Sequence, residues 1–226
     1  MSRRPTQSHL KRQQQEPLPP EPPERTEPGL PEPLEDHADY EGFSLADAIL
    51  DDIAAAGVTF RRIHFQQCAL ARTELHHVEF TDVRFEACNL ASADWEEARI
   101  SRVALEECGI VGGRFLDATF DDLTIRDSNC DITTFWKARF SRTRFERCTF
   151  RRASFEGADL SGVVFNDCDL TGADLRNTKL AGADFRGSRI EGIVAEARDL
   201  RGAIIAPDQA IELVGLLGVT VKWEGE

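Results

Sequence analysis

Large apolar side chains recur at every fifth position of this chain from Phe60 to Ile205, and only Cys130 and Ala195 break the pattern. Thirteen of the fourteen phenylalanines fall on this single phase. The residue two places before each of these positions is mostly small or β-branched, as at Val58. A fixed internal period over so long a stretch indicates a repeat architecture, in which each repeat contacts mainly its neighbours.

The five-residue period fits neither an ordinary helix nor a straight strand. On an α-helix, steps of five residues turn by about 140° and scatter the apolar side chains around the axis. In a strand, an odd period sends successive apolar side chains to opposite faces. The chain must therefore turn after every five residues, so that each apolar side chain points toward one common axis. This pattern predicts an all-β solenoid built from short sides.

The cysteines indicate how many sides make one coil. Five of the six occur at intervals of twenty residues or a multiple of twenty, and Ser128 and Ser188 occupy the missing places. These cysteines are Cys68, Cys88, Cys108, Cys148 and Cys168. Twenty residues are four repeats, so we predict a four-sided coil. Thiols stacked in successive parallel strands would lie about 4.8 Å apart, which suits neither a disulfide nor tetrahedral zinc, so we expect buried, reduced cysteines.

Three repeats closely resemble the pattern of the pentapeptide-repeat family, which is a small residue, Asp or Asn, Leu or Phe, any residue, and often Gly. They are Ala158-Asp159-Leu160-Ser161-Gly162, Cys168-Asp169-Leu170-Thr171-Gly172 and Ala183-Asp184-Phe185-Arg186-Gly187. The resemblance covers about 150 residues in one unbroken register. It implies a right-handed quadrilateral parallel β-helix, which we assign to residues 58–206. It says far less about function, because fold and function are separable.

A capping helix is predicted before the repeats. An open solenoid end would expose apolar core and unpaired strand edges, so both ends need a cover. Ser44 and Asp47 resemble a capping box, and Ile49 and Ile53 fall at helical spacing. We therefore predict a helix over residues 42–57.

A second cap is predicted over residues 207–226. Pro207 can open a helix, Gly218 can end it, and residues 219–223 would form a final strand. Quinolone-resistance members of the pentapeptide-repeat family resemble this chain in ending with a helical cap, and they dimerise through it. Surplus apolar surface and this resemblance predict a homodimer through the cap. Its apolar residues are Ile211, Leu213, Val214, Leu216, Leu217 and Trp223.

Residues 1–41 have the composition of a disordered arm. Nine of the ten prolines lie in the first forty residues, together with many Glu and Gln and few large apolar groups. The segment 17–23 could dock into an aromatic groove as a polyproline helix, or serve as a solvated linker. The sequence contains no run of eighteen apolar residues, so we expect neither a membrane span nor secretion, and place the chain in the cytoplasm.

The net charge is −13, and acidic groups concentrate in one part of the repeats. Quinolone-resistance members of the family look like double-stranded DNA in width, shape and negative charge, and act on DNA gyrase. The resemblance implies that this segment could mimic phosphates, although the unbroken register leaves no room for the inserted loops that some such members need. The acidic residues are Asp94, Glu96, Glu97, Glu106, Glu107, Asp117, Asp121, Asp122, Asp127 and Asp131.

The segment from Lys137 to Arg152 carries seven basic residues and only one acidic residue, Glu146. In isolation it looks like a nucleic-acid-binding patch. With twenty residues per coil, however, these cations spread around all four sides, and acids of adjacent coils face them, as Asp122 would face Arg142. We therefore expect ion pairs between coils that help fix the register, and we expect no direct nucleic-acid binding.

An apolar surface patch is the other candidate site. Leu116 and Trp136 share one outward position in adjacent coils, with Val111 and Ile132 at the neighbouring corner. Exposed apolar groups that stack suggest a partner site, and a fold-back of the N-terminal arm would cover them equally well.

No nucleophile elbow, glycine-rich phosphate loop or His-Glu metal motif is present in the sequence. His64, His76 and His77 occupy outward positions without a clear set of metal ligands around them. We therefore expect no cofactor, no metal site and no enzymatic activity. Two functions remain: a DNA-mimic protein that protects DNA gyrase or a related topoisomerase, and a general interaction scaffold centred on Trp136.

Overall fold

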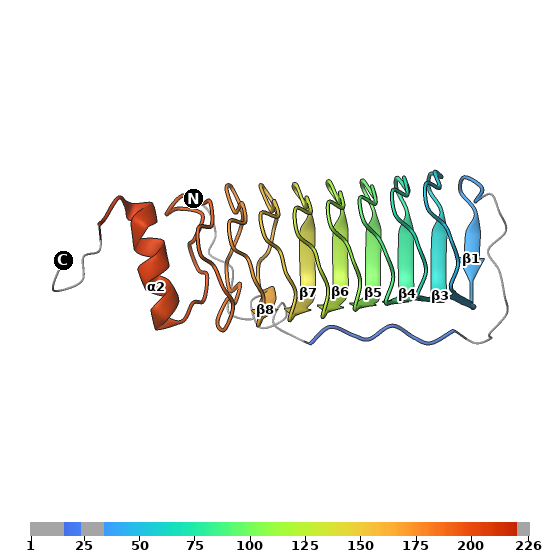
Figure 1. The fold of residues 1–226 in the computed structure, drawn as a ribbon, viewed down its shortest axis with the longest axis horizontal. Coiled ribbons are helices and arrows are strands. Elements are labelled where there is room, and N and C mark those ends of the chain that lie inside the picture. Colours follow the sequence, from blue (N-terminus) through green and yellow to red (C-terminus); the bar gives the residue numbers. More distant parts are fainter. Residues whose placement is uncertain (1–15, 24–33, 221–226) are drawn as a thin grey trace, which may run out of the picture.

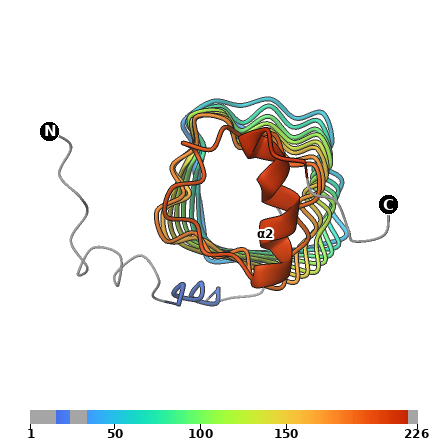
Figure 2. The ribbon, with the colours of Figure 1, turned by 90° about the vertical axis from the view of Figure 1, so that its left-hand side faces the viewer.

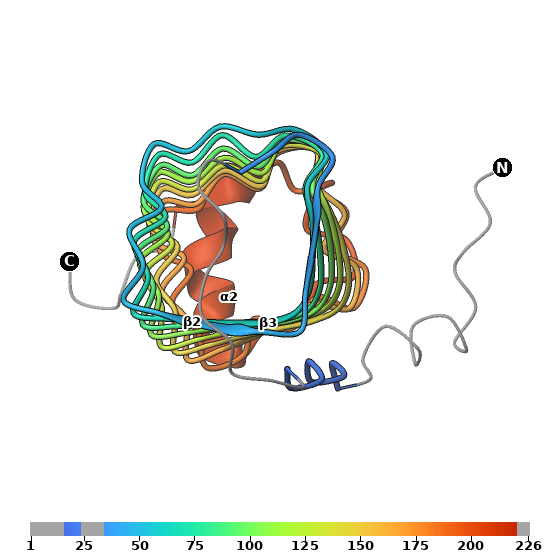
Figure 3. The same ribbon diagram turned by 90° about the vertical axis from the view of Figure 1, so that its right-hand side faces the viewer.

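The computed structural model describes residues 16–23 and 34–220, and within them the chain winds into a long rod (Figure 1). An eight-stranded parallel sheet runs along the rod in the order β1-β3-β4-β5-β6-β7-β8, and β2 also pairs with β3. Viewed from either end, the coils superpose in a square outline (Figures 2 and 3). The strands are β1 (Asp39–Glu41), β2 (Ser44–Ala46), β3 (Thr59–Gln66), β4 (Glu79–Glu86), β5 (Arg99–Glu106), β6 (Thr119–Arg126), β7 (Arg139–Glu146) and β8 (Val164–Asn166).

Every strand pair confirms the four-sided coil, because each residue pairs with the one twenty places later. Phe60 lies beside Phe80, and Phe120 lies beside Phe140. Isolated bridges with the same spacing, such as Arg114 with Thr134, join the sides between the long strands. The prediction of a parallel β-solenoid is therefore confirmed.

The apolar residues at every fifth position fill the axis of the rod. Because equivalent residues of successive coils lie one strand spacing apart, their rings stack face to face. The ring centroid of Phe135 lies 5.3 Å from that of Phe115 and 5.1 Å from that of Phe155. Phe120 and Phe140 pack edge-on against Phe135 from the next side of the square. The core is one continuous ladder of aromatic and aliphatic side chains.

Each corner of the square uses a left-handed backbone conformation two residues after the core residue. Gly162 has a φ of 75° there, and Asp82 and Ile132 adopt 58° and 61°. This conformation favours glycine and is costly for a β-branched side chain. The geometry explains why Gly ends the best repeats, since that place in the repeat is the corner.

The stacked cysteines are buried and free, as predicted. The Sγ of Cys88 lies 3.4 Å from the carbonyl oxygen of Phe65, within hydrogen-bonding distance for sulfur. Ser128 substitutes for a cysteine in the same ladder and accepts a hydrogen bond from the Cys108 amide at 3.0 Å. Burial raises the pKa of the Cys130 thiol well above its usual value, so that thiol stays protonated.

The predicted capping helix over residues 42–57 is wrong, because this segment forms one more coil. Strands β1 and β2 both pair with β3, and the solenoid begins at Asp39 instead of residue 58. Tyr40, Leu45 and Leu50 continue the five-residue period and are buried. The edge of β3 offers unpaired backbone groups along its length, and a strand satisfies them where a helix could not.

The C-terminal helix is confirmed as α2 (Pro207–Val214), which continues into a 3₁₀ turn at Gly215–Leu217 and covers the end of the rod (Figure 1). Pro207 starts the helix and Gly218, with a φ of 71°, ends it. Residues 219–220 form no strand, and the rest of the predicted final strand lies outside the described residues. Within the described ranges no helix has the length and apolarity needed to span a membrane.

Candidate functional site

Outward side chains form columns along the rod, because equivalent positions recur in every coil. One corner column alternates in charge, and we call it the Arg/Asp column: Arg62, Asp82, Arg102, Asp122 and Arg142. Arg102 donates two hydrogen bonds of 2.6 Å to Asp82. Arg142 likewise donates to both oxygens of Asp122, at 2.8 and 2.9 Å. These bidentate pairs hold the side chains of the column in place, so that it presents a row of hydrogen-bond acceptors and donors.

The two aspartates of this column are buried although they sit at corners, with exposures of 6% for Asp82 and 3% for Asp122. Burial alone would raise the pKa of Asp82, but hydrogen bonds from Arg102 and from the Glu21 amide hold that pKa below its usual value. Burial would likewise raise the pKa of Asp122, but hydrogen bonds from Arg142 and from the Leu18 amide hold that pKa below its usual value. Their stabilising effect is therefore present above the ordinary carboxyl pKa of about 4 and disappears as the pH falls through the lowered values.

The cover over these aspartates is the N-terminal segment of residues 16–23, which we call the strap. It lies outside the square outline and runs along the rod beside β3 to β7 (Figures 1 and 2). The Leu18 amide donates to Asp122 at 3.0 Å, and the Glu21 amide donates to Asp82 at 3.2 Å. Glu16 pairs with Arg144.

The strap corrects the prediction of a disordered arm over residues 1–41. Residues 16–23 are docked on the solenoid, Leu34 is part of the core, and β1 already belongs to the first coil. Composition predicted disorder because the segment has little apolar surface to bury. Hydrogen bonds to buried carboxylates hold it instead. Residues 1–15 and 24–33 of the predicted arm lie outside the described residues.

A shallow groove of about 350 Å³ lies between the strap and the outer face of β3 to β6. Its floor includes two small side chains, Ala104 and Thr124, which lie between larger members of the same column, Arg84 on one side and Arg144 on the other. Ala104 is buried although its side chain points outward, so other parts of the protein must cover it from outside. The small residues therefore form a dip into which an extended segment fits.

The predicted phosphate-mimic acids do not gather on one face, because they occupy several columns and corners. Six of the ten lie within ion-pairing distance of an arginine or a histidine. Within the described part of the chain, Glu96, Glu107, Asp117 and Asp131 have no ion pair. The paired acids include Asp94 with Arg114, Glu97 with His77, Glu106 with Arg84, Asp121 and Asp122 with Arg142, and Asp127 with Arg147. Asp131 accepts from the Arg151 amide at 2.9 Å.

The predicted pairing of the basic segment holds for two of its arginines, Arg142 and Arg147, which contact acids of the preceding coil. Arg151 pairs with Asp169 of the following coil at 2.9 Å. Lys137 places its ammonium 3.8 Å from the ring centroid of Trp136. These cations bridge neighbouring coils or cover an aromatic ring.

Leu116 and Trp136 lie in one column of adjacent coils, as predicted, and both are half-buried. The Asp117 amide donates to the Trp136 carbonyl at 2.9 Å, which places the two coils in direct contact there. Ile132 is 49% exposed at its corner, and Val111 is half-buried. The strap docks on the Arg/Asp column, so residues 16–23 are not the cover that a fold-back of the arm would have provided.

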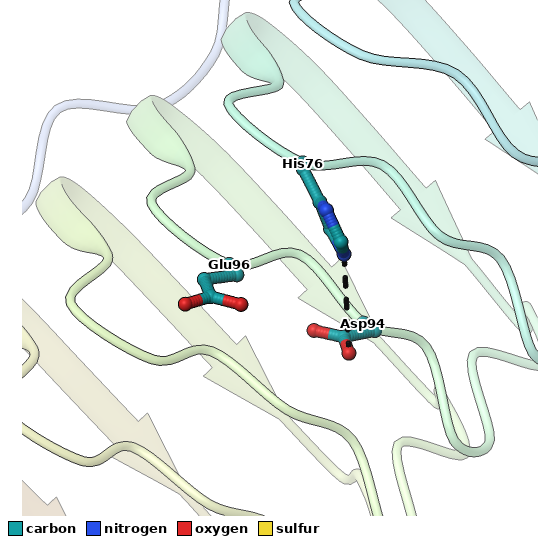
Figure 4. Close-up of side chains that lie close together, drawn as sticks. All are labelled: His76, Asp94 and Glu96. Atoms are coloured by element: carbon teal, nitrogen blue, oxygen red, sulfur yellow. Dashed lines mark ion pairs between the residues drawn. The ribbon is translucent and has the colours of Figure 1, made fainter.

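His76, Asp94 and Glu96 form a cluster that was not predicted from the sequence (Figure 4). Their nearest donor atoms lie within 4.8 Å of one another, and the His76 Nε2 is 4.0 Å from an Asp94 oxygen. The spacing of twenty that joins His76 to Glu96 was the signal that could have revealed it. Imidazole and carboxylates can bind a divalent cation, but Arg114 lies 3.5 Å from the same Asp94 oxygen and already balances its charge.

The C-terminal cap supplies an apolar hollow at the end of the rod. Leu213, Val214 and Leu216 line it together with Leu200 and Ile205, and its volume is about 160 Å³. Ile211 of α2 does not line this hollow and is 45% exposed. Trp223 lies outside the described residues, and the side chain of Leu217 is likewise not described. A homodimer through this cap stays a prediction.

The filled axis and the outer columns define a parallel β-solenoid of the repeat-protein class. The chain belongs to the pentapeptide-repeat family: the family described as "Pentapeptide repeat region" matches residues 58–135 and 138–204. No curated protein matches the chain.

Three solved structures illustrate the likeness. A trypsin-treated variant of QnrB1, a plasmid-mediated fluoroquinolone resistance protein, is 20% identical over 83% of this chain and 91% of its own, with a TM-score of 0.39. Full-length QnrB1 is 17% identical over 82% and 100%, with a TM-score of 0.31. HetL, involved in heterocyst differentiation regulation in the cyanobacterium Nostoc sp. strain PCC 7120, is 16% identical over 75% and 90%, with a TM-score of 0.26. These values carry no functional argument for this chain.

Proposed function

We propose that the chain is a non-enzymatic binding protein that acts through protein–protein contacts on its outer columns. The observation that carries this proposal is the apolar pair Leu116 and Trp136, which interrupts a column whose other described members are mostly polar. Large aromatic side chains of this kind dominate the binding energy of many interfaces. The buried thiols fit a reducing compartment, so the proposal places the protein in the cytoplasm.

Replacing Trp136 with alanine is expected to abolish partner capture and leave the fold intact. The test is affinity capture from the native host with the full chain as bait, followed by binding measurements on each recovered partner. Arg176→Ala is the matched control, because it truncates a side chain of the same column two coils further on. Identical partners and affinities for all three proteins would contradict the role of Trp136.

Topoisomerase protection is the second candidate, supported by the net charge of −13 and by the unpaired carboxylates of Glu96, Glu107 and Asp117. We expect the chain to reduce quinolone-induced DNA cleavage by purified gyrase. The triple change of these three residues to lysine is expected to remove the effect without breaking an ion pair. No reduction of cleavage at micromolar excess of the native chain would exclude this candidate.

A homodimer through the exposed apolar surface of the C-terminal cap belongs to the same proposal. A cyclic dimer of this kind would double the length of the rod, and each copy would present the same columns.

A further inference from the structure

The strap shows a period of three in both its sequence and its burial. Residues 17–23 read Pro-Leu-Pro-Pro-Glu-Pro-Pro, so Leu18 and Glu21 carry the only backbone amides in this stretch. Pro17, Pro20 and Pro23 are half-buried, whereas the residues between them are exposed. A polyproline II helix has three residues per turn, so these prolines share one edge that faces the solenoid.

This period matches the spacing of the acceptors beneath it. Three residues of polyproline II advance the chain by about 9.3 Å. Asp82 and Asp122 are two coils apart, which is about 9.6 Å at the spacing of parallel strands. Because Arg102 separates the two aspartates, an acceptor appears at every second coil and meets an amide at every third residue. Both amides of the stretch are thereby satisfied.

The remaining contacts hold the strap loosely. Leu18 leaves 57% of its surface exposed, and the groove under the strap retains about 350 Å³ of space above Ala104 and Thr124. The strap is held by the hydrogen bonds of two amides, one ion pair and the half-buried faces of three prolines. Another segment of the same kind can therefore replace it.

We propose that the Arg/Asp column and the Ala104–Thr124 groove form a docking site for polyproline II segments of partner proteins, and that the strap is a built-in competitor for this site. A segment that matches these acceptors presents a backbone amide at every third residue and has prolines at the positions between. Recognition depends on the backbone, so the identity of the amide-bearing residue is secondary. The site lies on a different side of the square from Trp136. This proposal can therefore be tested independently of the proposed function.

The test removes the two amides of the strap and keeps its polyproline shape. The full-length variant Leu18→Pro/Glu21→Pro releases the strap, whereas Leu18→Ala/Glu21→Ala removes the same side chains and retains both amides. The probe is a fluorescein-labelled, acetylated peptide of sequence EPLPPEPP, which reproduces residues 16–23. A peptide of identical composition, EPLPPPEP, separates its two internal amide-bearing residues by four positions instead of three. Binding is measured by fluorescence anisotropy.

The probe is expected to bind the proline variant at least about tenfold more tightly than the native chain, because a tethered competitor acts at millimolar effective concentration. The alanine variant is expected to behave like the native chain, and the shifted peptide to lose binding. Equal binding of both peptides, or no binding to the proline variant, would overturn the proposal. A concentration-dependent dimer of the native chain that disappears in the proline variant would also overturn it, because the strap would then dock between copies.

Discussion

Replacing Phe135 with alanine is expected to lower the free energy of unfolding by about 3–5 kcal/mol, the usual loss for a fully buried aromatic side chain. Phe135 is 2% exposed and stacks between Phe115 and Phe155. The neighbouring coils cannot move together to fill the cavity, because their spacing is fixed by backbone hydrogen bonds. Equilibrium unfolding in guanidinium chloride, followed by far-ultraviolet circular dichroism, measures the change.

Trp136→Ala is the matched control for this experiment, since it truncates a still larger ring at the next position of the same coil. Trp136 is half-buried on the outside, so its loss is expected to change stability by less than about 1 kcal/mol. Equal losses for the two variants would mean that the axis of the solenoid is not the main source of its stability.

Replacing Gln209 with alanine is expected to detach the C-terminal helix from the rod. The Gln209 side chain accepts from the Ala206 amide at 2.8 Å and donates to the carbonyls of Phe185 and Ser188 at 2.7 and 2.5 Å. It is the one buried residue of α2. Each buried polar group left without a partner costs about 1–3 kcal/mol, which is enough to open a helix of two turns.

Hydrogen exchange of the amides in α2, compared with those of β5, measures this detachment. Exchange should accelerate in α2 while the central coils keep their protection. Glu212→Ala, at an exposed position of the same helix, provides the control. If α2 exchanges equally in the Gln209 variant and the native chain, then packing of Leu213 alone anchors the cap.

The sequence was sufficient for the repeat core, because each core residue is specified by a period that holds independently of distant contacts. The ladder of cysteines gave the coil length for the same reason. The N-terminal coil was missed although Tyr40, Leu45 and Leu50 keep the period, since Ser44 and Asp47 also fit a helix start. Only the open edge of β3 decides between the two, and pairing partners are not visible in a local pattern.

The candidate surfaces were harder to predict, because charge along the chain differs from charge in space. The acids of residues 94–131 predicted one continuous negatively charged surface, yet most of them lie next to an arginine or a histidine once the coils stack. The docking of the strap depends on a match between two spacings, one in the prolines and one in the alternating column. Neither Leu18 nor Asp122 reveals that match without the other.

The alternating Arg/Asp column gives the rod a parity. Duplicating or deleting one coil between residues 62 and 142 would place like charges next to each other, whereas a change of two coils would preserve the alternation. It would also preserve the distance between successive aspartates. The central part of this solenoid can therefore lengthen by pairs of coils, and the unit of growth on its surface is twice the unit of its core.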